Sequence, residues 1–370
     1  MIGKIVKPYC WKYRFLYFTY PSFRIKLWTR SFFDSMSYYP EMSSQRKSQI
    51  RICIEQLINL LRHGSFDDFY FLYGFDIKGL RNKKEYVYYD DFFVRRDYMN
   101  FHRGIQYVGI LRDKLMFYCF AAAMNVPTPR VVGTIEKGVL SELFNGNSSS
   151  PFDYIVRHQF DGFIKAISGE CGNGVYAVRA KDNESILVDD DVLTREGFMQ
   201  LIENGKFIVQ ERITNQHPKL SALHQQSVNT IRLVTVMKDG KCTFLPPLLR
   251  VGAGHNKVDN WAKGGLAIGI DVATCTLNEY GYLKPQYGCK TDRHPDTGII
   301  FKGYQLPYLE ESIRLAMSLH EKLPKIHSIG WDLAITENGP VIIEGNDNWE
   351  ISLHQACSHG WYKEFKELFY

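Results

Sequence analysis

The amino-acid sequence predicts an α+β protein, and two observations lead to this fold class. First, the 370 residues are 45% hydrophobic and 14% aromatic, enough to bury the cores of two or three packed units. Second, strand-like apolar segments dominate and do not alternate strictly with helices, so a doubly wound parallel fold is not expected. The expected strands cover residues 163–167, 174–179, 207–213, 230–237, 242–249, 265–271, 331–336 and 340–344.

Helical spacing of apolar residues predicts three helices. The first covers residues 43–62 and begins at a serine cap, Ser43 or Ser44. The apolar residues on one face of this helix are Ile50, Ile54, Leu57, Ile58 and Leu61. The second covers residues 111–124 and ends where two prolines require extended backbone, and the third lies at about 309–323.

Composition excludes several classes of protein. Lysine and arginine exceed aspartate and glutamate by 45 − 40 = 5, too few to indicate a nucleic-acid partner. The eight cysteines contain no CxxC pair, which excludes a cysteine zinc cluster and disfavours a dense disulfide framework. No window approaches the ~18 consecutive apolar residues of a membrane-spanning helix. We therefore expect a cytoplasmic protein.

Residues 1–30 form an unusual arm. They contain seven lysines and arginines, nine aromatic residues and no acid. Cationic and aromatic residues mixed in this way suit the headgroup region of an anionic membrane. The alternative is an arm whose aromatic residues pack on the main body. The sequence thus leaves open a peripheral membrane contact through residues 1–30.

A strand that carries Lys165 is followed by a turn rich in glycine, at Gly169, Gly172 and Gly174, and then by another strand. Glycines let the backbone approach phosphate oxygens closely, and successive N–H groups can form an anion-binding nest. The lysine would add a positive charge to the same phosphates. The segment is neither a Walker loop nor a dinucleotide fingerprint. The alternative is a plain β-hairpin with a glycine turn.

Residues 331–346 predict a second hairpin, because two apolar runs flank an Asn-Gly pair. A two-residue turn at 338–339 would place Asp332 opposite Gly345, with Glu344 on the other face. A three-residue turn at 337–339, with a left-handed Gly339, would place Asp332 opposite Glu344. Asn346 would then follow on the same face.

The second register gathers two carboxylates and an amide oxygen. Like charges placed opposite each other are unfavourable unless a cation lies between them, and oxygen ligands favour Mg²⁺. The alternative is an acidic strand end exposed to solvent.

Together these segments resemble the ATP-grasp superfamily in their order and spacing. The short motifs at residues 229–232, 259–261 and 264–265 are most similar to those of its sugar-transfer-associated branch. The resemblance covers roughly residues 105–357. It implies two α+β lobes that clasp ATP between antiparallel sheets. The expected regions are an N-terminal helical region with the basic aromatic arm at 1–104, an N-terminal lobe at 105–210 and a C-terminal lobe at 211–370.

The resemblance also implies roles for individual residues. Lys114 and Lys165 would contact phosphates, and the glycine loop would close over them. The segment at the adenine edge would comprise Gln210, Glu211, Arg212 and Ile213. Two strand arginines, Arg232 and Arg250, would lie near the γ-phosphate, and the Mg²⁺ ligands would be Asp332, Glu344 and Asn346. Glu170 and Cys171 depart from the small residues common in this loop.

The resulting functional hypothesis is an ATP- and Mg²⁺-dependent carboxylate-amine ligase that acts through an acylphosphate, in polysaccharide or cell-surface glycan biosynthesis. Its acceptor would be a small molecule or a glycan. Two alternatives remain: a kinase on the same scaffold, which would phosphorylate a hydroxyl group, and a binding module that retains ATP without turnover. The complete set of Mg²⁺ ligands disfavours the binding module.

Overall fold

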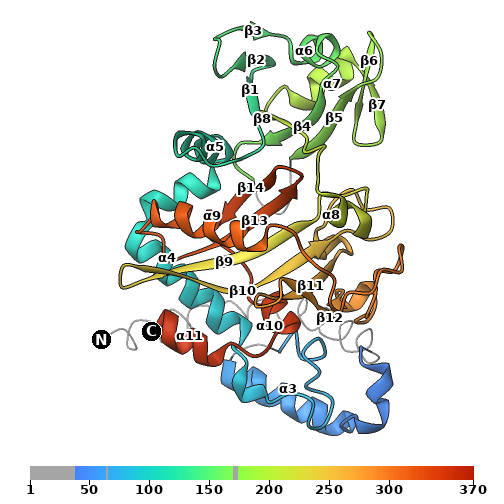
Figure 1. Ribbon diagram of the computed structural model, residues 1–370, viewed down its shortest axis with the longest axis vertical. Coiled ribbons are helices and arrows are strands. Elements are labelled where there is room, and N and C mark those ends of the chain that lie inside the picture. Colours follow the sequence, from blue (N-terminus) through green and yellow to red (C-terminus); the bar gives the residue numbers. More distant parts are fainter. Residues whose placement is uncertain (1–37, 64–65, 170–173) are drawn as a thin grey trace.

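The computed structural model describes residues 38–63, 66–169 and 174–370. The arm at 1–30 and the loop residues Glu170, Cys171 and Gly172 therefore lie outside the described residues. Two antiparallel sheets form the body of the protein, with helices packed around them (Figure 1). The α+β fold class predicted from the sequence is confirmed.

The first sheet has eight strands in the order β3-β2-β1-β8-β4-β5-β6-β7. Its bounds are β1 (Val131–Glu136), β2 (Val139–Glu142), β3 (Ser148–Ser149), β4 (Asp161–Ala166), β5 (Val175–Ala180), β6 (Ser185–Val188), β7 (Asp191–Thr194) and β8 (Lys206–Glu211). Two helices, α6 (Pro151–Arg157) and α7 (Arg195–Ile202), pack against it. Their buried residues Phe152 and Phe198 join the apolar core of this sheet.

The second sheet has six strands in the order β12-β11-β10-β9-β13-β14. Its bounds are β9 (Thr230–Lys238), β10 (Lys241–Val251), β11 (Leu266–Asp271), β12 (Thr276–Tyr282), β13 (Ser328–Thr336) and β14 (Gly339–Asn346). The predicted strands correspond to eight of the fourteen observed, whereas β1 to β3, β6, β7 and β12 were not predicted. Most of the unpredicted strands are short, so their apolar patterns are weak.

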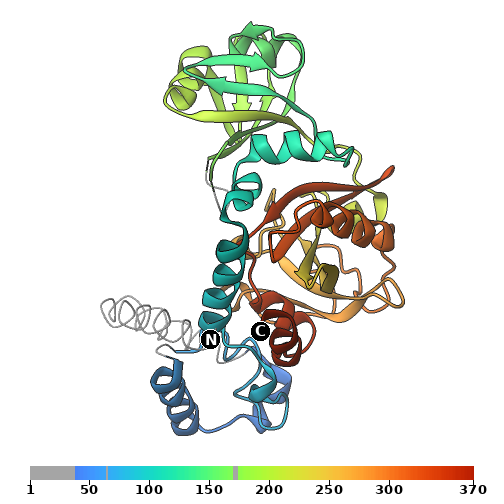
Figure 2. The ribbon, with the colours of Figure 1, turned by 90° about the vertical axis from the view of Figure 1, so that its left-hand side faces the viewer.

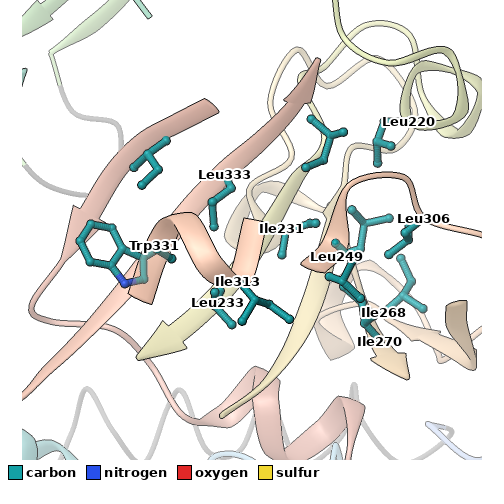
Figure 3. Packing of buried hydrophobic residues seen from close by; sticks show 14 of the residues in the cluster. Leu220, Ile231, Leu233, Leu249, Ile268, Ile270, Leu306, Ile313, Trp331 and Leu333 are labelled. Atoms are coloured by element: carbon teal, nitrogen blue, oxygen red, sulfur yellow. The ribbon is translucent and has the colours of Figure 1, made fainter. Parts of the chain in front are cut away.

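Both faces of the six-stranded sheet are buried. The adjacent residues Leu248 and Leu249 point to opposite faces and belong to two different apolar clusters. Helix α9 (Leu309–Glu321) packs with Leu249, Trp331 and their neighbours on one face (Figure 3). Helix α10 (Ser352–Cys357) packs with Leu248 on the other face, and the short helices α8 (Pro218–Leu223) and α11 (Tyr362–Phe369) complete the lobe.

A long helix, α4 (Tyr89–Arg112), runs beside the six-stranded sheet and leads to α5 (Lys114–Ala123) (Figure 2). The predicted helix at 111–124 is thus broken at Asp113, whose carboxylate accepts a hydrogen bond from Met116 N (2.9 Å) and caps α5. Gly104 lies where α4 approaches a neighbouring backbone, because an added Cβ would lie 2.5 Å from the carbonyl oxygen of Lys325. The predicted boundary at 104/105 falls within α4, and the domain division stays a prediction.

The N-terminal helix α3 (Gln49–His63) lies at the opposite end of the molecule from the eight-stranded sheet (Figures 1 and 2). The predicted cap was wrong: Ser43 and Ser44 belong to a preceding 3₁₀ helix, η1 (Pro40–Gln45). The remaining 3₁₀ segments are η2 (Lys83–Glu85), η3 (Trp261–Lys263) and η4 (Pro285–Tyr287). The apolar face predicted for α3 exists, but it faces away from the protein.

Candidate functional site

The hairpin β13–β14 places the two predicted metal-binding carboxylates opposite each other. Neither predicted turn is correct, because Thr336 pairs with Gly339 and the turn residues are 337 and 338. A β-bulge at Ile343 then shifts the register by one residue, so that Asp332 pairs with Glu344. The predicted pairing is therefore confirmed, although it arises from a bulge inside the strand.

Asn346 joins the two carboxylates, as its position in the strand predicts. Its amide nitrogen lies 3.2 Å from Glu344 Oε1 and 3.5 Å from Asp332 Oδ2. Burial and the nearby charge of Asp332 raise the pKa of Glu344. Glu344 forms no ion pair with any residue that the structure describes. The site thus contains one carboxylate whose charge no described cation neutralises at close range.

Asp332, in contrast, is neutralised by arginines on the next two strands of the sheet, β9 and β10. Arg232 is directly opposite it on β9 and donates two hydrogen bonds, Nε to Oδ1 (2.7 Å) and Nη2 to Oδ2 (2.9 Å). Arg250 on β10 donates a third, Nη1 to Oδ1 (3.2 Å). Burial alone would raise the pKa of Asp332, but the guanidinium groups of Arg232 and Arg250 hold it below its ordinary value.

Arg250 is itself positioned by Asp259, to which it donates a hydrogen bond of 2.6 Å. Asp259 is buried and also accepts hydrogen bonds from the backbone nitrogen and hydroxyl of Thr230. The Nε atom of Arg250 is buried and has no hydrogen-bond partner among the described residues. A buried donor without a partner is costly, so an added anion that reaches this atom would be stabilising.

The eight-stranded sheet contributes Lys165, on β4. Its ammonium group donates a hydrogen bond of 2.7 Å to the neutral Oε1 of Gln210 on β8, and no carboxylate among the described residues forms an ion pair with it. Burial lowers the pKa of Lys165 to about 8, an effect that the charge of Glu344 partly offsets. This electrostatic interaction links the lysine to the carboxylates of the other sheet.

The glycine loop is anchored where it leaves β4. Ser168 forms a β-bridge with Asp113, and Lys114 donates a hydrogen bond from Nζ to the carbonyl oxygen of Gly169 (2.9 Å). At the other end Gly174 has a φ of +68°, and an added Cβ would lie 2.9 Å from Ala166 Cβ. Glycine is therefore required at 174 by both conformation and space. In this structure Lys114 holds the loop; its predicted contact with phosphate stays a prediction.

The predicted adenine segment links the two sheets. Gln210 and Glu211 end β8, and Arg212 and Ile213 follow in the connection toward the six-stranded sheet. Gln210 is buried between Lys165 and the carbonyl oxygen of Pro129. The side chain of Arg212 pairs with Asp161 (2.7 Å). The side chain of Gln210 is thus held inside the protein and that of Arg212 in an ion pair nearer the surface, and the role of this segment at the adenine edge stays a prediction.

Sequence reasoning missed two ion pairs that support this site. Asp259 was noted as part of a motif but was given no role. Asp347, directly after Asn346, accepts two hydrogen bonds from Arg112 at the end of α4 (3.0 and 2.8 Å). The acid-rich run at 344–347 is a signal for Asp347. No local pattern indicates Arg112, which is 235 positions away in the chain.

The geometry agrees with a comparison of the sequence with protein-family models. Residues 94–367, which are most of the chain, match the model of the sugar-transfer-associated ATP-grasp family. The chain therefore belongs to this family, as its motifs indicated. A comparison with curated proteins finds no significant match.

Several solved structures are similar in fold. The chain is 12% identical to D-alanyl-alanine synthetase A from Vibrio cholerae, with a TM-score of 0.40 over 70% of this chain and 63% of that one. It is also 12% identical to N5-carboxyaminoimidazole ribonucleotide synthetase from Thermotoga maritima (TM-score 0.35; 66% and 44% covered). The D-alanine-D-alanine ligase from Coxiella burnetii is 10% identical (TM-score 0.37; 70% and 56% covered). The matches span less than two thirds of these proteins, and such low values support no conclusion about activity.

Among the described residues, no group of three or more histidine, cysteine, aspartate or glutamate side chains could hold a metal ion. The predicted set contains only two carboxylates and an amide, so a bound ion would need further oxygen ligands from a substrate or water. None of the described helices is long and apolar enough to cross a membrane.

Proposed function

We propose that the protein is an ATP- and Mg²⁺-dependent ligase that joins a carboxylate to an amine through an acylphosphate. The observation that carries the proposal is the pairing of Asp332 with Glu344, with Arg232 and Arg250 of β9 and β10 hydrogen-bonded to Asp332. Family membership supports ATP as the nucleotide, and the sugar-transfer association in the family's description supports an acceptor from glycan biosynthesis.

The residues present fit Mg²⁺ and the phosphates of ATP. Glu344 offers carboxylate oxygens beside Asp332, and a cation would relieve the repulsion between the two carboxylates. Asn346 directs its amide nitrogen at both carboxylates, so it would offer its oxygen to a cation only after its amide turns over. Two donors could meet phosphate oxygens: Lys165 on the eight-stranded sheet, which pairs with no described carboxylate, and the Nε atom of Arg250 on the six-stranded sheet, which has no hydrogen-bond partner among the described residues. When bound, Mg²⁺ would neutralise oxygens of the transferred phosphoryl group.

The residues of the chain then have distinct tasks. Lys165 would hold the phosphates, and the glycine loop would exclude water from them. A carboxylate oxygen of the substrate attacks the γ-phosphorus and ADP leaves, while Arg232 and Arg250 stabilise the developing charge. The amine then attacks the acyl carbon, loses a proton and displaces inorganic phosphate. Asp259 acts through Arg250 as a positioning residue.

The product of phosphoryl transfer tests this proposal. The purified protein would be screened for ADP release against a panel of amino acids, uronic acids and amino sugars. A ligase should release ADP and inorganic phosphate in equal amounts, with no AMP, and should require both a carboxylate and an amine. Hydroxylamine should trap the intermediate as a hydroxamate when the amine is omitted. Label from γ-labelled ATP that stays on the acceptor, without free phosphate, would establish the kinase instead.

A further inference from the structure

Helix α3 buries two polar side chains beside Ile52 and exposes a row of large apolar ones. Gln56 is fully buried: its Nε2 donates to the carbonyl oxygen of Asp67 (3.1 Å) and its Oε1 accepts from Asp67 N (2.9 Å). Asn59 is 3% exposed and accepts a hydrogen bond from Lys83. Glu55 accepts a hydrogen bond of 2.6 Å from the hydroxyl of Tyr70. These paired polar groups fix the rotation of the helix, because turning it would leave them buried without partners.

The outward side forms a continuous apolar face. Its members and their exposed fractions are Ile50 (75%), Ile54 (53%), Leu57 (51%), Ile58 (38%) and Leu61 (76%). At about 100° per residue these five side chains fall within an arc of roughly 100°, along nearly the whole helix. Large apolar side chains that gather on one exposed face indicate an interaction surface.

The edge of this face is cationic. At helical spacing Arg51 and Arg62 lie on the same flank of the apolar arc. The side chain of Arg51 is 61% exposed. Glu55, the acid of this helix, is turned toward the protein, where Lys47, Arg51 and Tyr70 contact it. An apolar face with a basic edge is the pattern of helices that lie in the plane of an anionic membrane.

We propose that α3 binds an anionic lipid surface, with its apolar face in the interfacial region and Arg51 and Arg62 against the headgroups. Charge favours this partner over residues 1–37 of the same chain. Residues 1–30 contain seven cations and no acid, so they would add positive charge beside Arg51 and Arg62. A second copy of the chain would likewise offer the same cationic edge. An anionic lipid surface complements both the helix and the preceding sequence.

The test is co-sedimentation of the full-length protein with vesicles. The probes are vesicles of phosphatidylglycerol and phosphatidylcholine, and vesicles of phosphatidylcholine alone. The double variant Ile50→Ser/Leu61→Ser should lower partitioning onto the anionic vesicles about tenfold or more, because two of the most exposed apolar side chains are lost. Arg51→Gln/Arg62→Gln should lower it by about tenfold on anionic vesicles only. A matched control, Ile105→Ser/Ile300→Ser, removes exposed isoleucines elsewhere (64% and 55% exposed) and should bind like wild type.

Three results would overturn the proposal. Unchanged vesicle binding by Ile50→Ser/Leu61→Ser would show that the face does not contact lipid. A wild-type dimer in light scattering without vesicles, converted to a monomer by the same variant, would assign the face to a second copy. A markedly lower melting temperature of the variant without vesicles would show that another segment of the chain already covers it. Circular dichroism would confirm that each variant keeps its helices.

Discussion

The two sides of the proposed site differ in how their charges are compensated. On the six-stranded sheet, Asp332 lies opposite Arg232 in the strand register and receives a further hydrogen bond from Arg250. On the eight-stranded sheet, Lys165 is held by the neutral amide of Gln210 and pairs with no described carboxylate. On the six-stranded sheet the charge of Asp332 is thus compensated within the protein itself, whereas that of Glu344 beside it is not. The eight-stranded sheet carries a cationic group whose burial is unfavourable until an anion arrives.

The largest expected effect is on turnover. Glu344→Gln keeps the shape of the side chain and removes the charge that a cation would need, so ADP release with a substrate pair should fall about a hundredfold to a thousandfold. The melting temperature should stay the same or rise, because the variant also removes the repulsion with Asp332. The control is Glu337→Gln in the exposed turn of the same hairpin, which should keep normal turnover. Turnover at the wild-type level in Glu344→Gln would show that this carboxylate has no role in the reaction.

The compensated side should be sensitive to the loss of one partner. Arg232→Gln leaves Asp332 buried with Arg250 alone, so the free energy of unfolding should fall by about 3–5 kcal/mol in urea denaturation. The control is Lys206→Gln, which breaks an exposed ion pair with Glu136 and should cost less than about 1 kcal/mol. Equal losses in the two variants would mean that the register of β9 and β13 contributes no special stability.

The side with Lys165 should respond in the opposite direction. Lys165→Met conserves most of the side-chain volume and removes a cation that the free protein does not pair with an anion. The free energy of unfolding should therefore stay the same or increase. Calorimetric titration should show that the affinity for ATP falls about tenfold or more, since the lysine no longer meets the phosphates. A loss of stability similar to that of Arg232→Gln would show that Lys165, like Arg232, makes a stabilising interaction in the free protein.

The sequence predicted which residues meet at this site better than the backbone geometry that brings them together. Period-two alternation and an Asn-Gly pair located the hairpin and allowed the pairing of Asp332 with Glu344. The actual two-residue turn at 337–338 and the bulge at Ile343, which offset each other in the register, could not be read from the turn residues alone. Hydrophobic spacing likewise located α3 but not the side that faces the protein, because Gln56 and Asn59 find their partners only in the tertiary structure. Both features depend on contacts between residues far apart in the chain, and a local sequence pattern carries no information about such contacts.

The last and smallest effect is the pH dependence of stability. The pKa of Lys165 is about 8 in the folded protein, below its ordinary value of 10.5, because burial disfavours the charged form. Between these two pH values the unfolded chain binds more protons at this position than the folded chain, so the contribution of Lys165 to stability becomes more favourable as pH rises. Below pH 8 the unfavourable contribution is present in full.

The advantage of Lys165→Met over wild type should consequently be largest at pH 7 and should shrink by about 1–3 kcal/mol as pH approaches 10.5. Urea denaturation of both proteins at pH 7, 8.5 and 10 measures this difference. Other lysines, tyrosines and cysteines titrate in the same range, but they are common to both proteins and cancel in the comparison. A difference that stays constant with pH would mean that Lys165 titrates normally in the folded protein. The contrast between the two sides of the site would then rest on hydrogen bonding, because the burial of charge would not distinguish them.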